Sequence, residues 1–167
     1  MKYTNSLELW QKIVQQFPEG GIVAISGYGG AGKTTLGIEL GRDKNDIQLI
    51  HVDDYLDWPK VCELNEDGVG VDFESILKAH IEPFRAGKKP VKYLIIEGIK
   101  LFREDRQKHF DCKIWVDTPI DQANVNGQAR RGENQRLWEE VWVPNEVAFE
   151  KKHNPKQYVD VFYEWNK

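Results

Sequence analysis

The stretch of sequence that decides the fold is Ile22-Val23-Ala24-Ile25-Ser26, followed at once by Gly27-Tyr28-Gly29-Gly30-Ala31-Gly32-Lys33-Thr34. The first segment is a continuous apolar run, which is typical of a strand buried on both faces of a parallel sheet. The second fits the pattern G-x-x-x-x-G-K-[ST], and a helical segment from about residue 33 to residue 41 follows it. A buried strand, a glycine-rich loop and a helix in this order predict a loop that binds phosphate groups.

The residue types of this loop fit phosphate chemistry. Glycines allow successive backbone N–H groups to turn inward and let the backbone approach a phosphate closely. The helix that begins at Lys33 points its positive end at the anion. We expect Lys33 to reach the β- and γ-phosphates of ATP and the hydroxyl of Thr34 to bind Mg²⁺. The expected nucleotide contacts are Gly27, Gly29, Gly30, Ala31, Gly32, Lys33, Thr34 and Thr35.

Strand-like and helix-like segments alternate outward from the loop. This alternation predicts a parallel sheet with helices on both faces, joined by right-handed crossovers. Together with the loop motif, it favours an α/β P-loop NTPase fold of three layers, with a sheet of about five strands. Besides residues 22–26, the expected strands are 47–52, 91–96, 112–116 and a last strand near the C-terminus; the expected helices are 1–20, 33–41, 72–86 and 135–152, with a kink or break at Pro144.

Size and composition limit the class of protein. The 167 residues predict a single domain over residues 1–167, and 40% hydrophobic with 30% charged residues is ordinary for a globular protein. No apolar run approaches the roughly 20 residues of a membrane helix, and the first residues do not lead into an apolar signal core. The 2 cysteines, Cys62 and Cys112, are too few for a disulfide framework, so we expect reduced thiols in a cytoplasmic protein.

The charge balance bears on the partners. Lys and Arg number 23 and Asp and Glu 27, which gives a net charge of −4. A dedicated nucleic-acid binder usually shows a basic excess or a basic stripe, and the sequence has neither. We therefore expect no nucleic-acid and no membrane partner, whereas local backbone dipoles still allow an anionic small molecule to bind. The sequence leaves the oligomeric state open.

Acidic residues end two of the expected strands. Leu94-Ile95-Ile96-Glu97-Gly98 puts Glu97 at the carboxyl end of a strand, where ligands of parallel sheets bind, so Glu97 is a candidate for binding Mg²⁺ and substrate. His51-Val52-Asp53-Asp54-Tyr55 closes another strand. Two roles are open for Asp53: it accepts the proton of an attacking hydroxyl, or it holds Mg²⁺. Strand alternation puts Asp54 on the opposite side.

Aromatic residues beside these acids are candidates for contact with the acceptor. Trp58 either stacks on a base or sugar or anchors its own loop on the core. Tyr55 follows the acids and either lines the acceptor site or only packs. His51 is expected to be a core residue, since it lies on a buried strand. The other tryptophans, which fit packing positions better, are Trp10, Trp115, Trp138, Trp142 and Trp165.

With these residues in order, the chain resembles the uridine kinase and phosphoribulokinase family of P-loop kinases. The resemblance covers nearly the whole chain after residue 20. It implies that Asp53 is the base toward the acceptor and that Thr34 and Glu97 position Mg²⁺. The segments that carry it are 25–36, 53–56, 95–102, 110–118 and 141–152.

Two regions depart from the family pattern. Uridine kinases carry an extra hairpin, rich in nucleoside contacts, between the helix that ends near Gly87 and the acidic strand, whereas residues 86–90 here lead almost directly into that strand. The lid, expected within residues 119–136, is short. Because the family carries arginines in the lid, the resemblance implies that Arg130 or Arg131 stabilises charge on the transferred phosphoryl group.

These observations predict an ATP-dependent kinase that transfers the γ-phosphoryl group to a hydroxyl of a small molecule. A nucleoside or a related metabolite is the expected acceptor, and a vitamin or a sugar is the alternative. A nucleotide-binding regulator that hydrolyses slowly is the main competing function. The Asn-Lys-x-Asp guanine-binding sequence of GTPase switches is absent. The net charge of −4 argues against a kinase that acts on nucleic acid.

Overall fold

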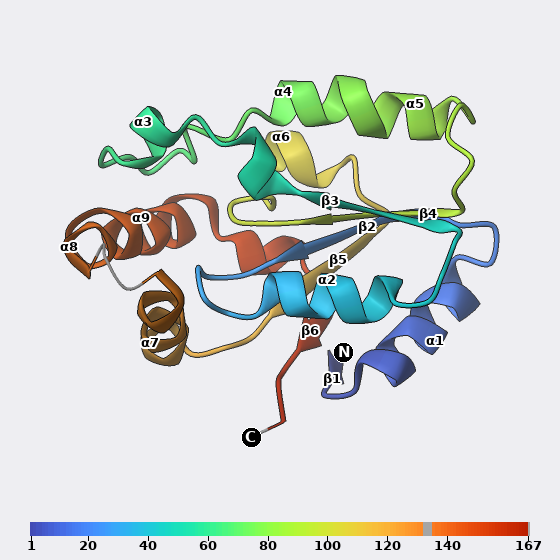
Figure 1. Cartoon of the computed structure of the whole chain (residues 1–167), viewed down its shortest axis with the longest axis horizontal. Coiled ribbons are helices and arrows are strands. Elements are labelled where there is room, and N and C mark those ends of the chain that lie inside the picture. The colour runs from blue at the N-terminus through green and yellow to red at the C-terminus, as the bar shows by residue number, and fades with distance from the viewer. Residues whose placement is uncertain (132–134, 167) are drawn as a thin grey trace.

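The computed structural model describes residues 1–131 and 135–166, without the side chains of Arg130 and Arg131. Within these residues the chain forms a sheet of six parallel strands in the order β1-β6-β5-β2-β4-β3 (Figure 1). The strands are β1 (Lys2–Tyr3), β2 (Gly21–Ser26), β3 (Ile47–His51), β4 (Tyr93–Glu97), β5 (Cys112–Val116) and β6 (Val161–Tyr163). The predicted α/β fold with a parallel sheet is confirmed.

The sheet has one strand more than the expected five, because β1 was not anticipated. Two residues are too few to show the alternation by which a strand is detected in a sequence. Backbone hydrogen bonds hold β1 beside β6: the N–H of Phe162 donates to the carbonyl of Met1, and the N–H of Glu164 to that of Tyr3, both at 2.8 Å. The first residues therefore extend the sheet before the predicted N-terminal helix begins.

Helices cover both faces of the sheet and give three layers (Figure 1). In that view α1 and α2 lie on one face, whereas α4, α5 and α6 lie on the other. The remaining helices gather at the end of the sheet where the strands finish. The bounds are α1 (Ser6–Gln16), α2 (Lys33–Gly41), α3 (Trp58–Val61), α4 (Phe73–Ile76), α5 (Glu82–Arg85), α6 (Glu104–Gln107), α7 (Ile120–Arg131), α8 (Gln135–Leu137) and α9 (Val143–His153). No helix among the described residues is long and apolar enough to cross a membrane.

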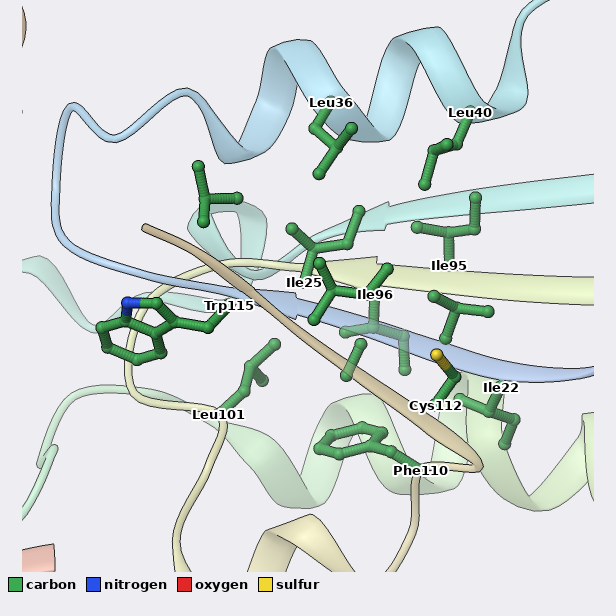
Figure 2. Close-up of a cluster of buried hydrophobic side chains, with 14 of the residues drawn as sticks. Ile22, Ile25, Leu36, Leu40, Ile95, Ile96, Leu101, Phe110, Cys112 and Trp115 are labelled. Atoms are coloured by element: carbon green, nitrogen blue, oxygen red, sulfur yellow. The ribbon is translucent and has the colours of Figure 1, made fainter. Parts of the chain in front are cut away.

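The core lies on both faces of the central strands. Every residue of β2 and β4 is buried. In Figure 2, Leu36 and Leu40 of α2 point toward one face of these strands, and Leu101 and Phe110 lie against the other. Burial of a Leu or Phe side chain stabilises a fold by roughly 1.5–3 kcal/mol, so this double-sided core fixes the strand ends that carry the site.

Two of the predicted helices contain a π turn directly before a proline. These turns are η2 (Leu77–Ile81), ahead of Pro83, and η3 (Trp138–Trp142), ahead of Pro144. Proline has no N–H to bond four residues back. The preceding N–H groups instead bond five residues back, from Glu82 to Leu77 and from Val143 to Trp138, which widens the turn. The irregularity predicted at Pro144 is confirmed in this form.

Candidate active site

A cavity opens at the end of the sheet where the parallel strands finish, the end at which α/β folds bind ligands. It brings together the predicted residues Lys33, Thr34 and Glu97, and Asp53 and Trp58 line it as well. Gly27, Ala31 and Thr35 belong to the predicted loop but do not line this cavity. The full lining is Gly29, Gly30, Gly32, Lys33, Thr34, Asp53, Leu56, Trp58, Val61, Glu97, Ile99, Lys100, Gly127, Trp138, Trp142, Asn145 and Glu146.

The glycine-rich loop needs glycine at two positions for backbone and packing reasons. Gly30 and Gly32 have φ angles of +80° and +95°, in the left-handed region that side chains disfavour. A Cβ on Gly30 would lie 2.0 Å from the carbonyl oxygen of Ala123, and one on Gly32 would lie 2.4 Å from the indole nitrogen of Trp165. A side chain at either position would therefore collide with α7 or with Trp165.

Lys33 lies at the start of α2 with its ammonium group folded back over the loop. The side chain is buried, and Nζ donates to the carbonyl of Tyr28 at 2.7 Å. The Tyr28 hydroxyl in turn donates to Glu150 of α9. Burial, and then Glu150, raise the pKa of Tyr28, which keeps the phenol protonated. The loop and its lysine are thus anchored to α9.

Thr34 and Glu97 meet across α2 and β4. The Thr34 hydroxyl donates to Glu97 Oε1 at 3.0 Å, and Glu97 is buried at the end of its strand. A hydroxyl beside a carboxylate offers the hard oxygen ligands that Mg²⁺ prefers. Among the described residues no three His, Cys, Asp or Glu side chains cluster to hold a metal by themselves. This pair therefore fits Mg²⁺ that is held jointly with nucleotide phosphates, the usual arrangement for this ion.

His51 contacts Glu97, and its expected place in the core was wrong. In the parallel pairing of β3 and β4, His51 is the register partner of Glu97. Its Nδ1 lies 2.6 Å from Glu97 Oε1, and its side chain is 37% exposed. A histidine in this position orients the carboxylate, as partners of metal-binding groups commonly do. Strand pairing, which the sequence pattern does not reveal, decides this contact.

Asp53 lies in the short 3-10 turn η1 (Val52–Tyr55) that follows β3. It lines the cavity, whereas Asp54 does not. Two backbone bonds fix the chain here, because the N–H of Asp57 donates to the Gly70 carbonyl at 2.8 Å and the N–H of Asp72 to the Tyr55 carbonyl at 2.9 Å. These bonds therefore help to hold Asp53 in its place at the cavity.

The two aromatic candidates near Asp53 have different surroundings. Trp58, at the start of α3, lines the cavity and is 41% exposed, which favours a ligand contact over an anchor on the core. Tyr55 does not line the cavity. Its hydroxyl lies 2.5 Å from His80 Nε2, and its ring packs edge-on against that imidazole. The cavity therefore includes Trp58 and leaves Tyr55 in a contact with η2.

The segment predicted to form the lid, residues 119–136, contains α7 and the start of α8. Ala123 and Gly127 of α7 pack against the glycine-rich loop, and Thr118 donates to the Ala31 carbonyl at 3.0 Å. The side chains of Arg130 and Arg131 lie outside the part of the chain that the structure describes, so their predicted role stays a prediction.

Comparison with known proteins shows which fold this architecture belongs to. No protein-family model and no curated protein sequence matches the chain. Solved structures do match: a candidate uridine kinase from Bacillus stearothermophilus (17% identity, TM-score 0.69, 95% of this chain and 96% of that one) and a candidate fructose transport system kinase from a Silicibacter species (17%, 0.72, 98% and 100%). Shikimate kinase from Acinetobacter baumannii is more distant (14%, 0.55, 92% and 88%). The chain has the P-loop kinase fold.

One wall of the site in this P-loop kinase fold was not predicted. We call it the helical wall, and it consists of Trp138, Trp142, Asn145 and Glu146 on η3 and α9. Trp138 packs closely on both α7 and the glycine-rich loop: a Cβ on Gly127 of α7 would lie 2.3 Å from its ring, and one on Gly29 of the loop 2.9 Å. The two indoles meet edge-on with centroids 5.1 Å apart. Trp138 and Trp142 follow shortly after the predicted lid, and no sequence signal marks them beyond packing.

Two buried charged residues of the site were also missed. Glu146 Oε1 accepts a hydrogen bond from the Gly29 N–H at 2.5 Å. Burial raises the pKa of Glu146, against the opposing effects of Lys33, the Gly29 N–H and Lys100. Lys100 follows β4 with φ +58°, and burial lowers its pKa while Glu146 opposes that shift. Both residues lie in segments that carry the family resemblance, 95–102 and 141–152, but the sequence assigns neither of them a role.

Proposed function

We propose that this protein is an ATP-dependent kinase that transfers the γ-phosphoryl group to a hydroxyl of a small molecule. The observation that supports it most is the shared cavity of Lys33, Thr34, Glu97 and Asp53. Phosphoryl transfer needs positioning and charge stabilisation more than covalent chemistry from the protein, and these residues supply both.

The loop and the start of α2 hold the nucleotide. Backbone N–H groups of the loop and the positive end of α2 face the phosphates, and Lys33 adds a full charge beside the β- and γ-phosphates. Thr34 and Glu97 would hold Mg²⁺, which neutralises charge on the phosphates when it is bound. His51 keeps the Glu97 carboxylate oriented through the contact at 2.6 Å.

Asp53 acts on the acceptor. The acceptor oxygen forms a bond to the γ-phosphorus, the bond from that phosphorus to the bridging oxygen of ATP breaks, and ADP leaves. The hydroxyl proton passes to the Asp53 carboxylate, the role of the catalytic aspartate in kinases. Arg130 or Arg131 completes the charge stabilisation from the lid, as the family resemblance implies.

The acceptor class rests on the aromatic side of the cavity. Trp58 and Trp142 give flat apolar surfaces on which a heterocyclic ring can stack. This favours a nucleoside or a related metabolite, as in uridine kinases, over a sugar; a vitamin with a flat ring fits as well. Tyr55 is engaged with His80, so we assign acceptor contact to Asp53, Glu97 and Trp58.

The state of the two cysteines bears on the proposed cell compartment. Cys62 and Cys112 are both free, which fits the reducing cytoplasm. We therefore propose a cytoplasmic enzyme, and the net charge of −4 supports a small-molecule partner and no nucleic-acid partner.

A two-step screen tests the function. Thermal unfolding with a non-hydrolysable ATP analogue and Mg²⁺ is measured against a panel of nucleosides, vitamins and sugars, because a ligand of the native state raises Tm. Compounds that raise Tm are then tested for ADP release that depends on the acceptor. We expect at least one ring-bearing compound to pass both steps. Binding of ATP with no active acceptor in the panel would favour the slow-hydrolysing regulator instead.

A further inference from the structure

The carboxylate of Glu146 contacts the backbone of the glycine-rich loop. Glu146 comes from the first turn of α9, yet its Oε1 accepts the N–H of Gly29 at 2.5 Å. The residue is only 9% exposed. Its other oxygen, Oε2, is buried and has no hydrogen-bond partner among the described residues. A buried carboxylate with one unsatisfied oxygen is costly, and such groups in native proteins call for an explanation.

The groups around this carboxylate are those that bind phosphate. Lys33 and Lys100 line the same cavity as Glu146, and both favour its ionised form electrostatically. An inward-turned loop N–H and two ammonium groups make an anion-binding subsite. The Gly29 N–H donates to the carboxylate directly, whereas Lys33, whose Nζ donates to the Tyr28 carbonyl, and Lys100 act on it through their charge. A nucleotide phosphate would therefore compete with Glu146 for the Gly29 N–H and for the charge of both lysines.

We propose that Glu146 is an internal substitute for a nucleotide phosphate: its carboxylate holds the subsite formed by the Gly29 N–H, Lys33 and Lys100, and it leaves when nucleotide binds. Glu146 is thus a positioning residue that lowers nucleotide affinity, and Lys100 is a second cation for phosphate. The proposal rests on the proposed function in one respect, namely that the loop binds a nucleotide.

Charge balance explains why the subsite can hold either the Glu146 carboxylate or a nucleotide phosphate. Without an anion beside them, two buried ammonium groups would repel each other in a poorly solvated site. Glu146 supplies one negative charge but satisfies only part of its own hydrogen-bonding capacity. A phosphate group offers more oxygens and more charge to the same donors, which favours the exchange.

Binding of ATP to Glu146→Gln tests the proposal. The variant keeps the shape of the side chain and removes its charge. Isothermal titration of the full chain is done with ATP and, separately, with tripolyphosphate, which lacks the base, each with Mg²⁺ and with EDTA. In this variant the side chain at position 146 loses its charge-assisted hydrogen bond with the Gly29 N–H and competes less well with phosphate. We therefore expect the Kd of the variant for both ligands to be about tenfold lower than that of wild type.

Two further variants complete the design. Glu139→Gln removes an exposed carboxylate of the same helical segment, which accepts from Gln135 at 2.9 Å, and should change Kd less than twofold. Glu146→Ala removes even the neutral acceptor of Gly29 and should bind at least as tightly as Glu146→Gln. It decides the matter if the glutamine variant misfolds in a thermal melt.

The outcomes separate the two proposals. Equal or weaker binding by the Glu146 variants, with wild type binding ATP, would overturn the inference and leave the kinase assignment intact. If the variants bound ATP more weakly than wild type with Mg²⁺ but not with EDTA, the inference would be wrong and Glu146 would be a metal-binding residue. No binding of either ligand by wild type and variants alike would contradict the nucleotide site itself.

Discussion

The two sides of the candidate site are built in opposite ways. On the side that we call the sheet edge, Lys33, Thr34, Asp53 and Glu97 stand directly at strand ends or at the start of α2, within short segments of continuous sequence. The helical wall reaches the same cavity from η3 and α9, more than a hundred residues along the chain from the loop it touches: Glu146 and Gly29 are 117 residues apart. One side is local and regular, and the other is assembled by tertiary packing.

We expect the two sides to contribute differently, the sheet edge to phosphoryl transfer and the helical wall to ligand affinity and stability. The sheet edge carries the groups that phosphoryl transfer requires, held on strands that are buried on both faces. The helical wall carries indoles and a carboxylate, for which we propose the roles of shaping the acceptor space and competing for the loop. We therefore expect substitutions at the sheet edge to lower the rate, and substitutions in the helical wall to change affinity or stability.

The largest expected effect is that of Lys33→Met. Removing the buried ammonium group takes away a charge that acts on the transferred phosphoryl group, so acceptor-dependent ADP release should fall by about 10³-fold. The measurement is a coupled ADP assay at saturating ATP. Lys88→Met, an exposed lysine after α5, is the matched control and should leave the rate unchanged. A fall of less than tenfold for Lys33→Met would break the assignment of the chemistry to the sheet edge.

The paired changes Trp58→Ala and Trp138→Ala sharpen the contrast between ligand contact and packing. Trp58 is 41% exposed in the cavity, so its loss should raise KM for the acceptor by roughly tenfold, the value of one stacked ring, with little change in Tm. Trp138 is buried against Gly29 and Gly127, so its truncation should cost about 3 kcal/mol of unfolding free energy. Steady-state kinetics and denaturant unfolding of both variants provide the measurements.

The reverse pattern would be informative. If Trp58→Ala lowered stability and left KM unchanged, the indole would be an anchor of its loop and not an acceptor contact. If Trp138→Ala unfolded no more easily than wild type, the helical wall would not be packed on the loop as described.

The sequence predicted what depends on local pattern. The run from Ile22 to Thr34 yields β2, the loop and the start of α2, because strand burial, glycine conformation and helix start are all short-range properties. Pro144 likewise predicted the break that the π turn provides, since a missing N–H acts within one turn.

The rest depends on which segments meet. The sequence predicts a core position for His51 because a buried strand favours that interpretation, and only the pairing with β4 reveals its contact with Glu97. Glu146 and Lys100 resemble ordinary surface charges in sequence, and their burial follows from the packing of α9 against the loop. The two-residue strand β1 is too short to carry any periodic signal.

The central claim is that the sheet edge moves a phosphoryl group from ATP to an acceptor. The most direct measurement follows label from γ-³²P-ATP with the best acceptor of the screen, for wild type, Asp53→Asn and Asp54→Asn. We predict label in the acceptor in amounts equal to the ADP formed, a rate at least about 100-fold lower for Asp53→Asn, and a change under threefold for Asp54→Asn. Label released only as inorganic phosphate, or equal transfer by wild type and Asp53→Asn, would contradict the account.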